Sequence, residues 1–253
     1  MTGLAQLLKN QGKTVWGSDT SEHFFTNEVL QHAGVECLED WNAAHLERQI
    51  DVVVRSTAYG DAHPEVAAAK AKGIPVLSYP EALGEFVSQY KSLAVTGSHG
   101  KTTTTAMLAH VLHSAGLAPS ALVGSQVPQF AGNALVGSGE LFIFEADEYQ
   151  NKLQYYKPSG VILTSIQWDH PDFFPSAQEY QAAFVEFLKK IPADGFVVAC
   201  YDSESVKQAV AAANLTPAQV STYGLSQGNT KLMRMWLDEG KWHFSATEGE
   251  EYL

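Results

Sequence analysis

SLAVTGSHGKTTTTAMLAHVLHSA, residues Ser92–Ala115, combines three local patterns in one uninterrupted run. A short apolar segment at 93–95 comes first, a turn at 96–100 follows, and a long helical pattern begins at Lys101 and Thr102. A buried strand, a glycine-containing turn and a helix in this order are typical of a phosphate-binding loop. We therefore predict such a loop between the strand and the helix.

The residue types in this loop suit a polyphosphate. Gly97 and Gly100 allow the backbone to curl until consecutive N–H groups point into one concavity. The first turn of the helix adds free N–H groups and the positive end of its dipole. Lys101 can reach terminal phosphates, and the Thr102 hydroxyl can ligate Mg²⁺. The general pattern G-x-x-x-x-G-K-S/T is matched only in part, because Val95 replaces its first glycine, and a strand-to-helix turn with a chance Gly-Lys-Thr is the alternative.

Composition narrows the classes of protein to which the chain can belong. Its 253 residues, 45% of them hydrophobic, suffice for one large or two medium domains. A formal net charge of −12 disfavours non-specific binding to nucleic acids or anionic membranes. The apolar runs are far shorter than the roughly 20 residues of a membrane span, and the first residues lack the apolar core of a signal peptide. Cys37 and Cys200 show no metal-ligand spacing, so we expect a reducing, cytoplasmic environment.

Strand and helix patterns alternate through the first part of the chain, as in an α/β fold. Strands are predicted at 14–17, 51–56 and 74–78, with a helix at 63–72 between the last two. Asp19 follows the first of these strands. An acidic residue at such a strand end commonly holds a ribose hydroxyl in a Rossmann-like fold, although a lone Asp there is more often a turn residue.

The second part of the chain continues the alternation and then changes character near Thr222. A glycine-rich, weakly periodic connection is expected at 125–139, and Gly240 is expected in the turn of a β-hairpin. The predicted elements are strands at 121–124, 141–145, 160–166 and 195–201, helices at 176–190 and 203–213, and hairpin strands at 231–237 and 241–246.

Three predicted strand ends carry chemically active side chains. The phosphate-binding loop follows the strand at 93–95, Glu145 closes the strand LFIFE, and Asp169-His170 follows GVILTSI. Ligands of α/β folds collect beyond the carboxyl ends of parallel strands, so these groups should meet at one edge. Mg²⁺ prefers oxygen ligands, which favours Glu145 with Thr102, whereas imidazole is a less usual ligand. Alternatively, the acidic run at 145–148 is a solvated helix start and His170 a capping or core residue.

Several of these motifs resemble those of the Mur ligases. TGSHGKTTTT is similar to the G-T/S-H-G-K-T-T-T loop of that family, EADEY to its E-A-D/C-E-S/Y segment, and SIQWDH to its N-I-x-x-D-H segment. The stretch RSTAYGDAHPEVAAAKAKGIPVLSYPEALGEF resembles a segment of the members that add L-alanine. The resemblance implies a Rossmann-like domain at 1–90 that binds a UDP-sugar, followed at 91–253 by a P-loop NTPase-like Mur ligase central domain, both incomplete.

What the resemblance implies about activity is an ATP-dependent amide ligase of peptidoglycan synthesis. The lactyl carboxylate of UDP-N-acetylmuramate attacks the γ-phosphate of ATP to give an acyl phosphate, and an amino acid or peptide amine then displaces phosphate. Matched by motif, Lys101 and His170 are the catalytic candidates, and Thr102, Glu145 and His170 are the magnesium ligands. The candidates for ATP binding are Gly97, Ser98, His99, Gly100, Lys101, Thr102 and Thr103. The candidates for substrate binding are Asp19, Ser56, His99 and Asn133. His99 is equally compatible with a residue that only fills the turn.

Departures from the family pattern leave the amine substrate open. Val185 occupies the position at which several members carry a carbamylated lysine. The alanine-adding members also lack that lysine, so this departure favours them. The DEY triplet and WDHPDFFP instead favour the ligase that attaches murein tripeptide to the same sugar nucleotide, and Ser165 replaces the usual Asn. Two readings from other classes also remain: a nucleotide-binding module without catalysis, and a P-loop kinase or hydrolase.

The resemblance also implies that family segments are missing from this chain. MTGLA is similar to the end of the family's glycine-rich G-x-G-G-x-G-M-S-G loop, so the first strand and the glycines of that loop are expected to be absent. The third domain and the G-R-H-N-x-x-N segment have no counterpart here. We expect this polypeptide to be inactive alone, and its oligomeric state is open.

Overall fold

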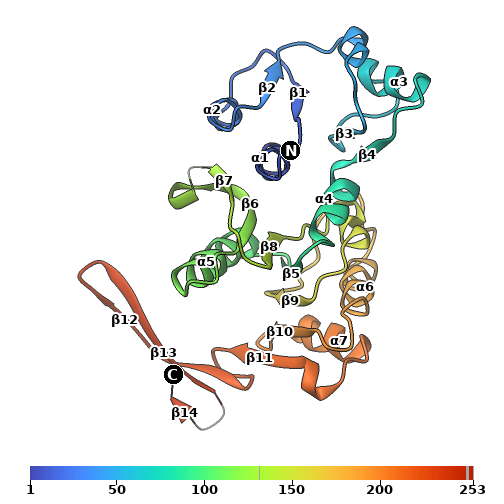
Figure 1. The fold of residues 1–253 in the computed structure, drawn as a ribbon. Helices are drawn as coiled ribbons and strands as arrows, with labels where there is room; N and C mark the ends of the chain where they lie inside the picture. Colours follow the sequence, from blue (N-terminus) through green and yellow to red (C-terminus); the bar gives the residue numbers. More distant parts are fainter. Residues whose placement is uncertain (131, 249–250, 253) are drawn as a thin grey trace.

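A single large sheet forms the centre of the molecule (Figure 1). The computed structural model describes residues 1–130, 132–248 and 251–252. Within these residues the sheet has ten strands in the order β14-β13-β12-β11-β10-β9-β5-β8-β6-β7. The predicted α/β fold class is thereby confirmed. The strands are β5 (Lys91–Thr96), β6 (Ser120–Val127), β7 (Gly132–Leu135), β8 (Leu141–Glu145), β9 (Gly160–Leu163), β10 (Phe196–Cys200), β11 (Val220–Gly224), β12 (Thr230–Asp238), β13 (Lys241–Glu248) and β14 (Glu251–Tyr252).

The strand β5 lies between β8 and β9 and runs parallel to both. Its last residues pair Val95 with Glu145 on β8 and Thr96 with Leu163 on β9. The carboxyl ends of the three strands therefore meet at one edge of the sheet, as the sequence predicted. Everything that follows these strands in the chain starts from that edge.

Helices cover both faces of this sheet. Successive strand side chains point to opposite faces, so Phe142 and Phe144 join one apolar cluster while Ile143 joins the other. The helices α4, α6 and α7 contribute to the first cluster and α5 to the second. A strand covered on both sides is apolar throughout, which explains the run LFIF. The helices concerned are α4 (Tyr79–Val87), α5 (Lys101–Ser114), α6 (Ala177–Leu188) and α7 (Glu204–Ala212).

The helix α6 was predicted at 176–190 with one apolar face. Tyr180, Phe184, Phe187 and Leu188 on that face are all buried, which confirms the prediction. Ser176 begins the helix, because its hydroxyl accepts the Glu179 N–H at 3.2 Å as an N-cap. The helix thus brings the Tyr180 hydroxyl to a fixed position beneath the edge of the sheet.

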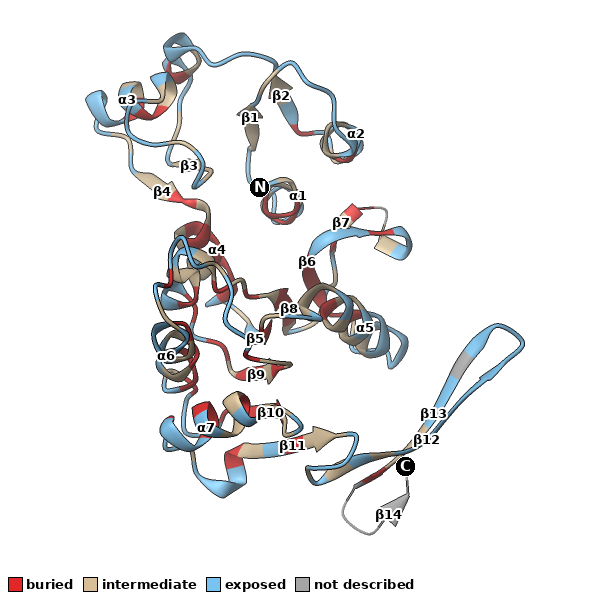
Figure 2. Cartoon of the chain, turned by 180° about the vertical axis from the view of Figure 1, so that it is seen from behind, coloured by how far each residue is buried: buried red, intermediate tan, exposed pale blue. Residues whose placement is uncertain are grey.

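The far end of the sheet confirms one prediction and corrects another. The strands β12 and β13 form the predicted antiparallel hairpin, with Gly240 at φ +75° in its turn. The hairpin projects from the body of the molecule and most of its described side chains are exposed (Figures 1 and 2). The stretch 125–139, expected to be an irregular connection, instead completes β6 and contains β7. Antiparallel hydrogen bonds stabilise this pair of strands. A weakly periodic sequence gives no signal that predicts them.

The first part of the chain carries two small sheets in place of one continuous Rossmann-like sheet. β1 pairs with β2 and β3 pairs with β4, each in parallel, and no ladder joins the two pairs within the described residues. Residues of β1 and β3 are only half-buried, which shows that these strands are incompletely covered. The elements are α1 (Thr2–Asn10), β1 (Trp16–Ser18), α2 (Phe25–His32), β2 (Glu36–Leu38), η1 (Ala43–Glu47), β3 (Val53–Arg55), α3 (Pro64–Ala71) and β4 (Val76–Ser78).

The helix α4 joins the first part of the chain to the central sheet. Leu83, Phe86 and Val87 are buried in the main apolar cluster, and Figure 2 shows α4 as a largely buried helix. At Gly84 the helix approaches the 3₁₀ helix η3 (Tyr149–Tyr155) so closely that a Cβ atom would lie 2.4 Å from the Tyr155 carbonyl oxygen. None of the described helices combines the length and the apolar character that crossing a membrane requires.

We expect Gly84→Ala to lower the free energy of unfolding by about 1–3 kcal/mol, because the new methyl group has no room against η3. Gly60→Ala is the matched control, since a Cβ there would meet no atom within 4 Å; its effect should stay within about 0.5 kcal/mol. Urea unfolding followed by circular dichroism measures both. Equal stability of the two variants would show that α4 and η3 do not pack as described.

Candidate functional site

The predicted strand, turn and helix at 91–114 are present, and the turn is tightly packed. Gly97 has φ +131° and Gly100, which begins α5, has φ +80°, both in the region that favours glycine. A Cβ atom on Gly97 would lie 2.3 Å from Thr164 Oγ1 and 2.7 Å from the Ser165 carbonyl oxygen. The loop therefore needs glycine here because the segment after β9 presses against it.

Hydrogen bonds hold the loop to the segment that follows β9. The Ser98 N–H donates to the Ser165 carbonyl at 3.0 Å, and the Gln167 N–H donates to Ser98 Oγ at 2.7 Å. The His99 N–H donates to Ser165 Oγ at 3.1 Å, and its ring pairs with the Gln167 side chain at 2.9 Å. The sequence is equally compatible with a His99 that contacts substrate and one that only fills the turn. In the structure the His99 side chain is exposed and hydrogen-bonded to Gln167.

Lys101, the first residue of α5 after the loop, forms a buried ion pair. Its Nζ lies 2.9 Å from Glu148 Oε2 and donates to the Gly97 carbonyl at 2.6 Å. The side chain of Lys101 is 14% exposed and that of Glu148 only 1%. The Tyr180 hydroxyl donates to Glu148 Oε1 at 2.8 Å and contacts Ser98 Oγ at 2.9 Å. The loop, the segment after β8 and the helix α6 thus meet at one carboxylate.

Two tyrosines near the acidic run at 145–148 have raised pKa values. Burial raises the pKa of Tyr180 above its ordinary value and the Glu148 charge adds to the shift, whereas the hydrogen bond to Ser98 opposes it. Burial also raises the pKa of Tyr79 to about 12, with smaller contributions from Glu145 and Asp147. Both phenols therefore stay protonated at neutral pH, and Tyr180 can donate to the carboxylate.

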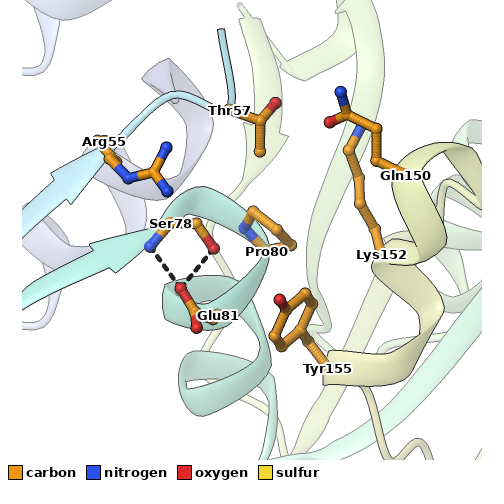
Figure 3. Close-up of a pocket in the computed structure, with 8 residues that line it drawn as sticks. All are labelled: Arg55, Thr57, Ser78, Pro80, Glu81, Gln150, Lys152 and Tyr155. Carbon is orange, nitrogen blue, oxygen red and sulfur yellow. Dashed lines mark hydrogen bonds between the residues drawn. The ribbon is translucent and has the colours of Figure 1, made fainter. Parts of the chain in front are cut away.

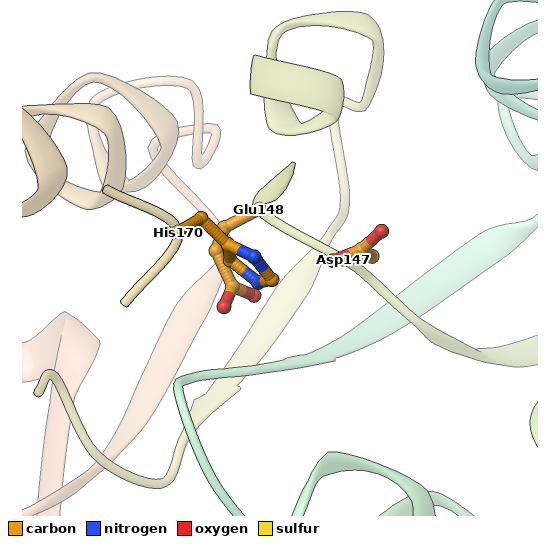
Figure 4. Close-up of side chains that lie close together, drawn as sticks. All are labelled: Asp147, Glu148 and His170. Atoms are coloured by element: carbon orange, nitrogen blue, oxygen red, sulfur yellow. The ribbon is translucent and has the colours of Figure 1, made fainter. Parts of the chain in front are cut away.

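A second group of side chains lies beside the ion pair. One ligand atom each from Asp147, Glu148 and His170 lies within 4.8 Å of the others (Figure 4). Asp147 is also paired with Lys152 at 2.5 Å. His170 has φ +55°, and its ring stacks on Tyr149 with centroids 4.5 Å apart. Two carboxylates and an imidazole can hold a divalent cation, provided that the cation replaces the positive charge of the lysines.

The predicted magnesium ligands are distributed differently from this group. Glu145 lies at the end of β8, half-buried, and its carboxylate accepts the Gly124 N–H at 2.8 Å. Thr102 and Thr103 lie in the first turn of α5, half-buried and exposed respectively. Of the predicted set only His170 belongs to the Asp147–Glu148–His170 group. The sequence did not predict individual roles for Asp147 and Glu148. The acidic run that follows a buried strand was the signal that pointed to this segment.

The predicted substrate-binding residues lie on several elements. Asp19 follows β1 and Ser56 follows β3, so each lies at the carboxyl end of a parallel strand. Asn133 lies on β7, where its Nδ2 donates to the Val123 carbonyl at 3.0 Å. Its Oδ1 is buried and has no hydrogen-bond partner among the described residues. No hydrogen bond joins Asp19, Ser56 and Asn133 to one another within the described part of the chain.

Almost the whole chain matches known protein families. Residues 95–252 match the Mur ligase middle domain, and residues 1–91 match a domain described as the Mur ligase family catalytic domain.

Individual relatives agree with the family match. A UDP-N-acetylmuramate–L-alanine ligase of Desulfitobacterium hafniense is 40% identical over 228 residues, which are 90% of this chain and 49% of that relative. A protein of the same name from Clostridium novyi is 36% identical over 255 residues, which are 100% and 54% of the two chains. The chain thus spans about half the length of these curated relatives.

A solved structure shares the fold over the whole chain. It is the UDP-N-acetylmuramate:L-alanyl-gamma-D-glutamyl-meso-diaminopimelate ligase of Neisseria meningitides, with a TM-score of 0.87 and 28% identity. The match covers 100% of this chain and 82% of that one.

The Lys101–Glu148 pair can be tested by a double-mutant cycle. Lys101→Met leaves a buried carboxylate unpaired and should cost about 3–5 kcal/mol of unfolding free energy. Glu148→Leu should cost less, because Lys101 is 14% exposed and can turn towards water. The double variant should recover most of both losses, since a buried pair is often replaceable by apolar side chains. Strictly additive losses in urea unfolding would show that the two side chains do not interact.

Proposed function

The chain belongs to the Mur ligase family, and on that premise we propose that it forms the sugar-nucleotide-binding and ATP-binding parts of an ATP-dependent peptidoglycan ligase. The parent reaction joins L-alanine to the carboxylate of UDP-N-acetylmuramate. The glycine-bounded loop at 97–100, which presents Lys101 at the start of α5, carries this proposal. The names of the reported relatives support the alanine substrate.

We propose that the loop holds the polyphosphate of ATP. Gly97 and Gly100 permit the backbone curvature that points N–H groups inward, and the fourteen-residue helix α5 adds the positive end of its dipole. Lys101 would exchange its bond to Glu148 for a phosphate oxygen. In this family ATP supplies the phosphoryl group that activates a carboxylate, and Mg²⁺ supplies positive charge. The residues present fit both, because the Lys101 ammonium group and the N-terminal end of α5 lie at the loop, with the carboxylates of Asp147 and Glu148 beside them.

The metal and substrate assignments follow the same reasoning. Thr102, Glu145 and His170 are our proposed magnesium ligands, and Asp147 and Glu148 lie beside His170. For the sugar nucleotide we propose Asp19, Ser56, His99 and Asn133. The buried, unpartnered Oδ1 of Asn133 supports its inclusion, because such an atom ordinarily needs a hydrogen-bond donor. We also propose that 1–90 and 91–253 are separate domains and that the protein works in the cytoplasm.

A second candidate reaction differs only in the amine. The Neisseria ligase, whose name specifies an L-alanyl-gamma-D-glutamyl-meso-diaminopimelate substrate, shares the fold of the whole chain. The segments Asp147-Glu148-Tyr149 and WDHPDFFP also favour attachment of a tripeptide to the same sugar nucleotide. The relatives that carry the alanine name are more similar in sequence, so L-alanine remains our first proposal.

Calorimetric titration with Mg-ADP tests the nucleotide site. Lys101→Ala should weaken binding at least about tenfold, because a charge-assisted contact to phosphate is lost. Lys189→Ala is the matched control and should bind normally, since among the described residues that lysine pairs only with Glu186 on the surface. If folded unmodified chain does not bind Mg-ADP, the proposed ATP site is wrong.

Binding of Mn²⁺, a paramagnetic ion that can replace Mg²⁺, tests the proposed metal ligands. His170→Ala should weaken Mn²⁺ binding in the presence of ADP by roughly tenfold or more, because a ligand or its immediate neighbour is removed. His113→Ala, at an exposed position in the last turn of α5, should leave binding unchanged. Electron paramagnetic resonance reports free Mn²⁺ directly. Equal affinities of the two variants would exclude His170 from the site.

A further inference from the structure

A polar cavity of about 290 Å³ lies between the first part of the chain and η3 (Figure 3). Arg55 and Thr57 enter it from the end of β3, and Gln150, Lys152 and Tyr155 enter it from η3. The first turn of α4 forms the remaining wall. The cavity thus lies beyond the carboxyl ends of β3 and β4, where α/β folds usually bind their ligands. None of the residues proposed above for ATP, metal or substrate lines it.

The charges in this cavity are unusual for so acidic a chain. Arg55 is half-buried and forms no ion pair with any described residue; its Nη1 donates to the Tyr59 carbonyl at 2.5 Å. Glu81, the acidic residue in the wall, accepts from both the N–H and the hydroxyl of Ser78 at 2.7 and 2.6 Å. Oε2 of this carboxylate therefore caps α4, whereas Oε1 makes no hydrogen bond to a described residue. A guanidinium with unused donors thus lines the cavity.

The opposite wall of the cavity contributes a second cation, Lys152, from a segment with a strained backbone. Gln150 and Asn151 have φ +54° each, a left-handed conformation that costs roughly 1–2 kcal/mol per residue. This turn directs Gln150 and Lys152 towards the side from which Arg55 and Thr57 approach (Figure 3). Lys152 is 17% exposed and shares its charge with Asp147. Because α4 and η3 touch at Gly84, the two walls hold a fixed separation.

We propose that this cavity is a binding site for a phosphate-type oxyanion, held between Arg55 and Lys152. The Arg55 guanidinium presents planar donors that match phosphate oxygens, and Lys152 supplies a point charge from the other side. The Thr57 and Tyr155 hydroxyls and the Gln150 amide add neutral donors. The volume accommodates a phosphate or diphosphate group, but not a whole nucleotide sugar. The anion is free phosphate or a phosphoryl group of the sugar nucleotide, and the second source rests on the function proposed above.

Phosphorus NMR titration with pyrophosphate tests the site. The experiment uses the full chain and its Lys101→Ala variant, in which the phosphate-binding loop has lost its cation and contributes less to binding. Arg55→Ala should weaken the cavity's affinity for pyrophosphate about tenfold or more, and Arg55→Lys should restore part of it. Lys157→Ala, an exposed lysine near η3 that does not line the cavity, is the matched control and should change nothing. Higher salt should weaken binding in the unmodified chain.

Parallel titrations identify the source of the anion. Arg55→Ala lowers the affinity for UDP as well if the site holds a phosphoryl group of the sugar nucleotide, and lowers only that for phosphate and pyrophosphate if the site holds the free anion. Equal binding by Arg55→Ala and Lys157→Ala overturns the proposal, as does absence of binding to the Lys101→Ala chain in its folded state. Mg-ADP titration of Arg55→Ala keeps the two proposals apart: unchanged ADP affinity supports the ATP site independently of the cavity.

Discussion

The ion pair between Lys101 and Glu148 is the contact on which the arrangement of the site depends. The Glu148 side chain is only 1% exposed. A charged carboxylate so deeply buried is stable only if a cation balances its charge and donors bind its oxygens. Lys101 supplies the charge, and the Tyr180 hydroxyl supplies a further donor. Since these groups come from α5, α6 and the segment after β8, satisfying one buried charge sets the relative positions of three elements.

The same pair also helps to fix the shape of the loop. Lys101 folds back over its own loop and donates to the Gly97 carbonyl, so the loop contains its own cation. Gly97 in turn packs against Thr164 and Ser165, where no side chain would fit. The hydrogen bonds of Ser98 and His99 to Ser165 and Gln167 complete the attachment. These contacts fix the loop backbone, so a polyphosphate bound at the proposed ATP site would cost the loop little further backbone entropy.

The acidic character of the chain gives its few cations a particular meaning. With a formal net charge of −12, long-range attraction of polyanions is weak, so the proposed phosphate recognition would depend on local cations. Lys101 directly follows the loop, whereas Arg55 and Lys152 line a separate cavity, where Lys152 also pairs with Asp147. The helix α4 holds that cavity together, because its glycine contact with η3 joins the first part of the chain to the central sheet.

The sequence by itself determined the local elements: the strand, turn and helix at 91–114, the strand LFIFE, the amphipathic helix α6 and the hairpin around Gly240. Each is encoded by a period of two or of 3.6 residues or by a glycine, and such signals need no distant partner. Only the tertiary structure decided which carboxylate does what. Within EADE, Glu145 bonds to Gly124, Asp147 to Lys152 and Glu148 to Lys101. Gly124 and Lys101 lie 21 and 47 residues from the carboxylates that they bind. The carboxylates of one acidic run are chemically alike until folding buries one of them. Arg55 and Lys152 likewise share a cavity only because α4 packs on η3.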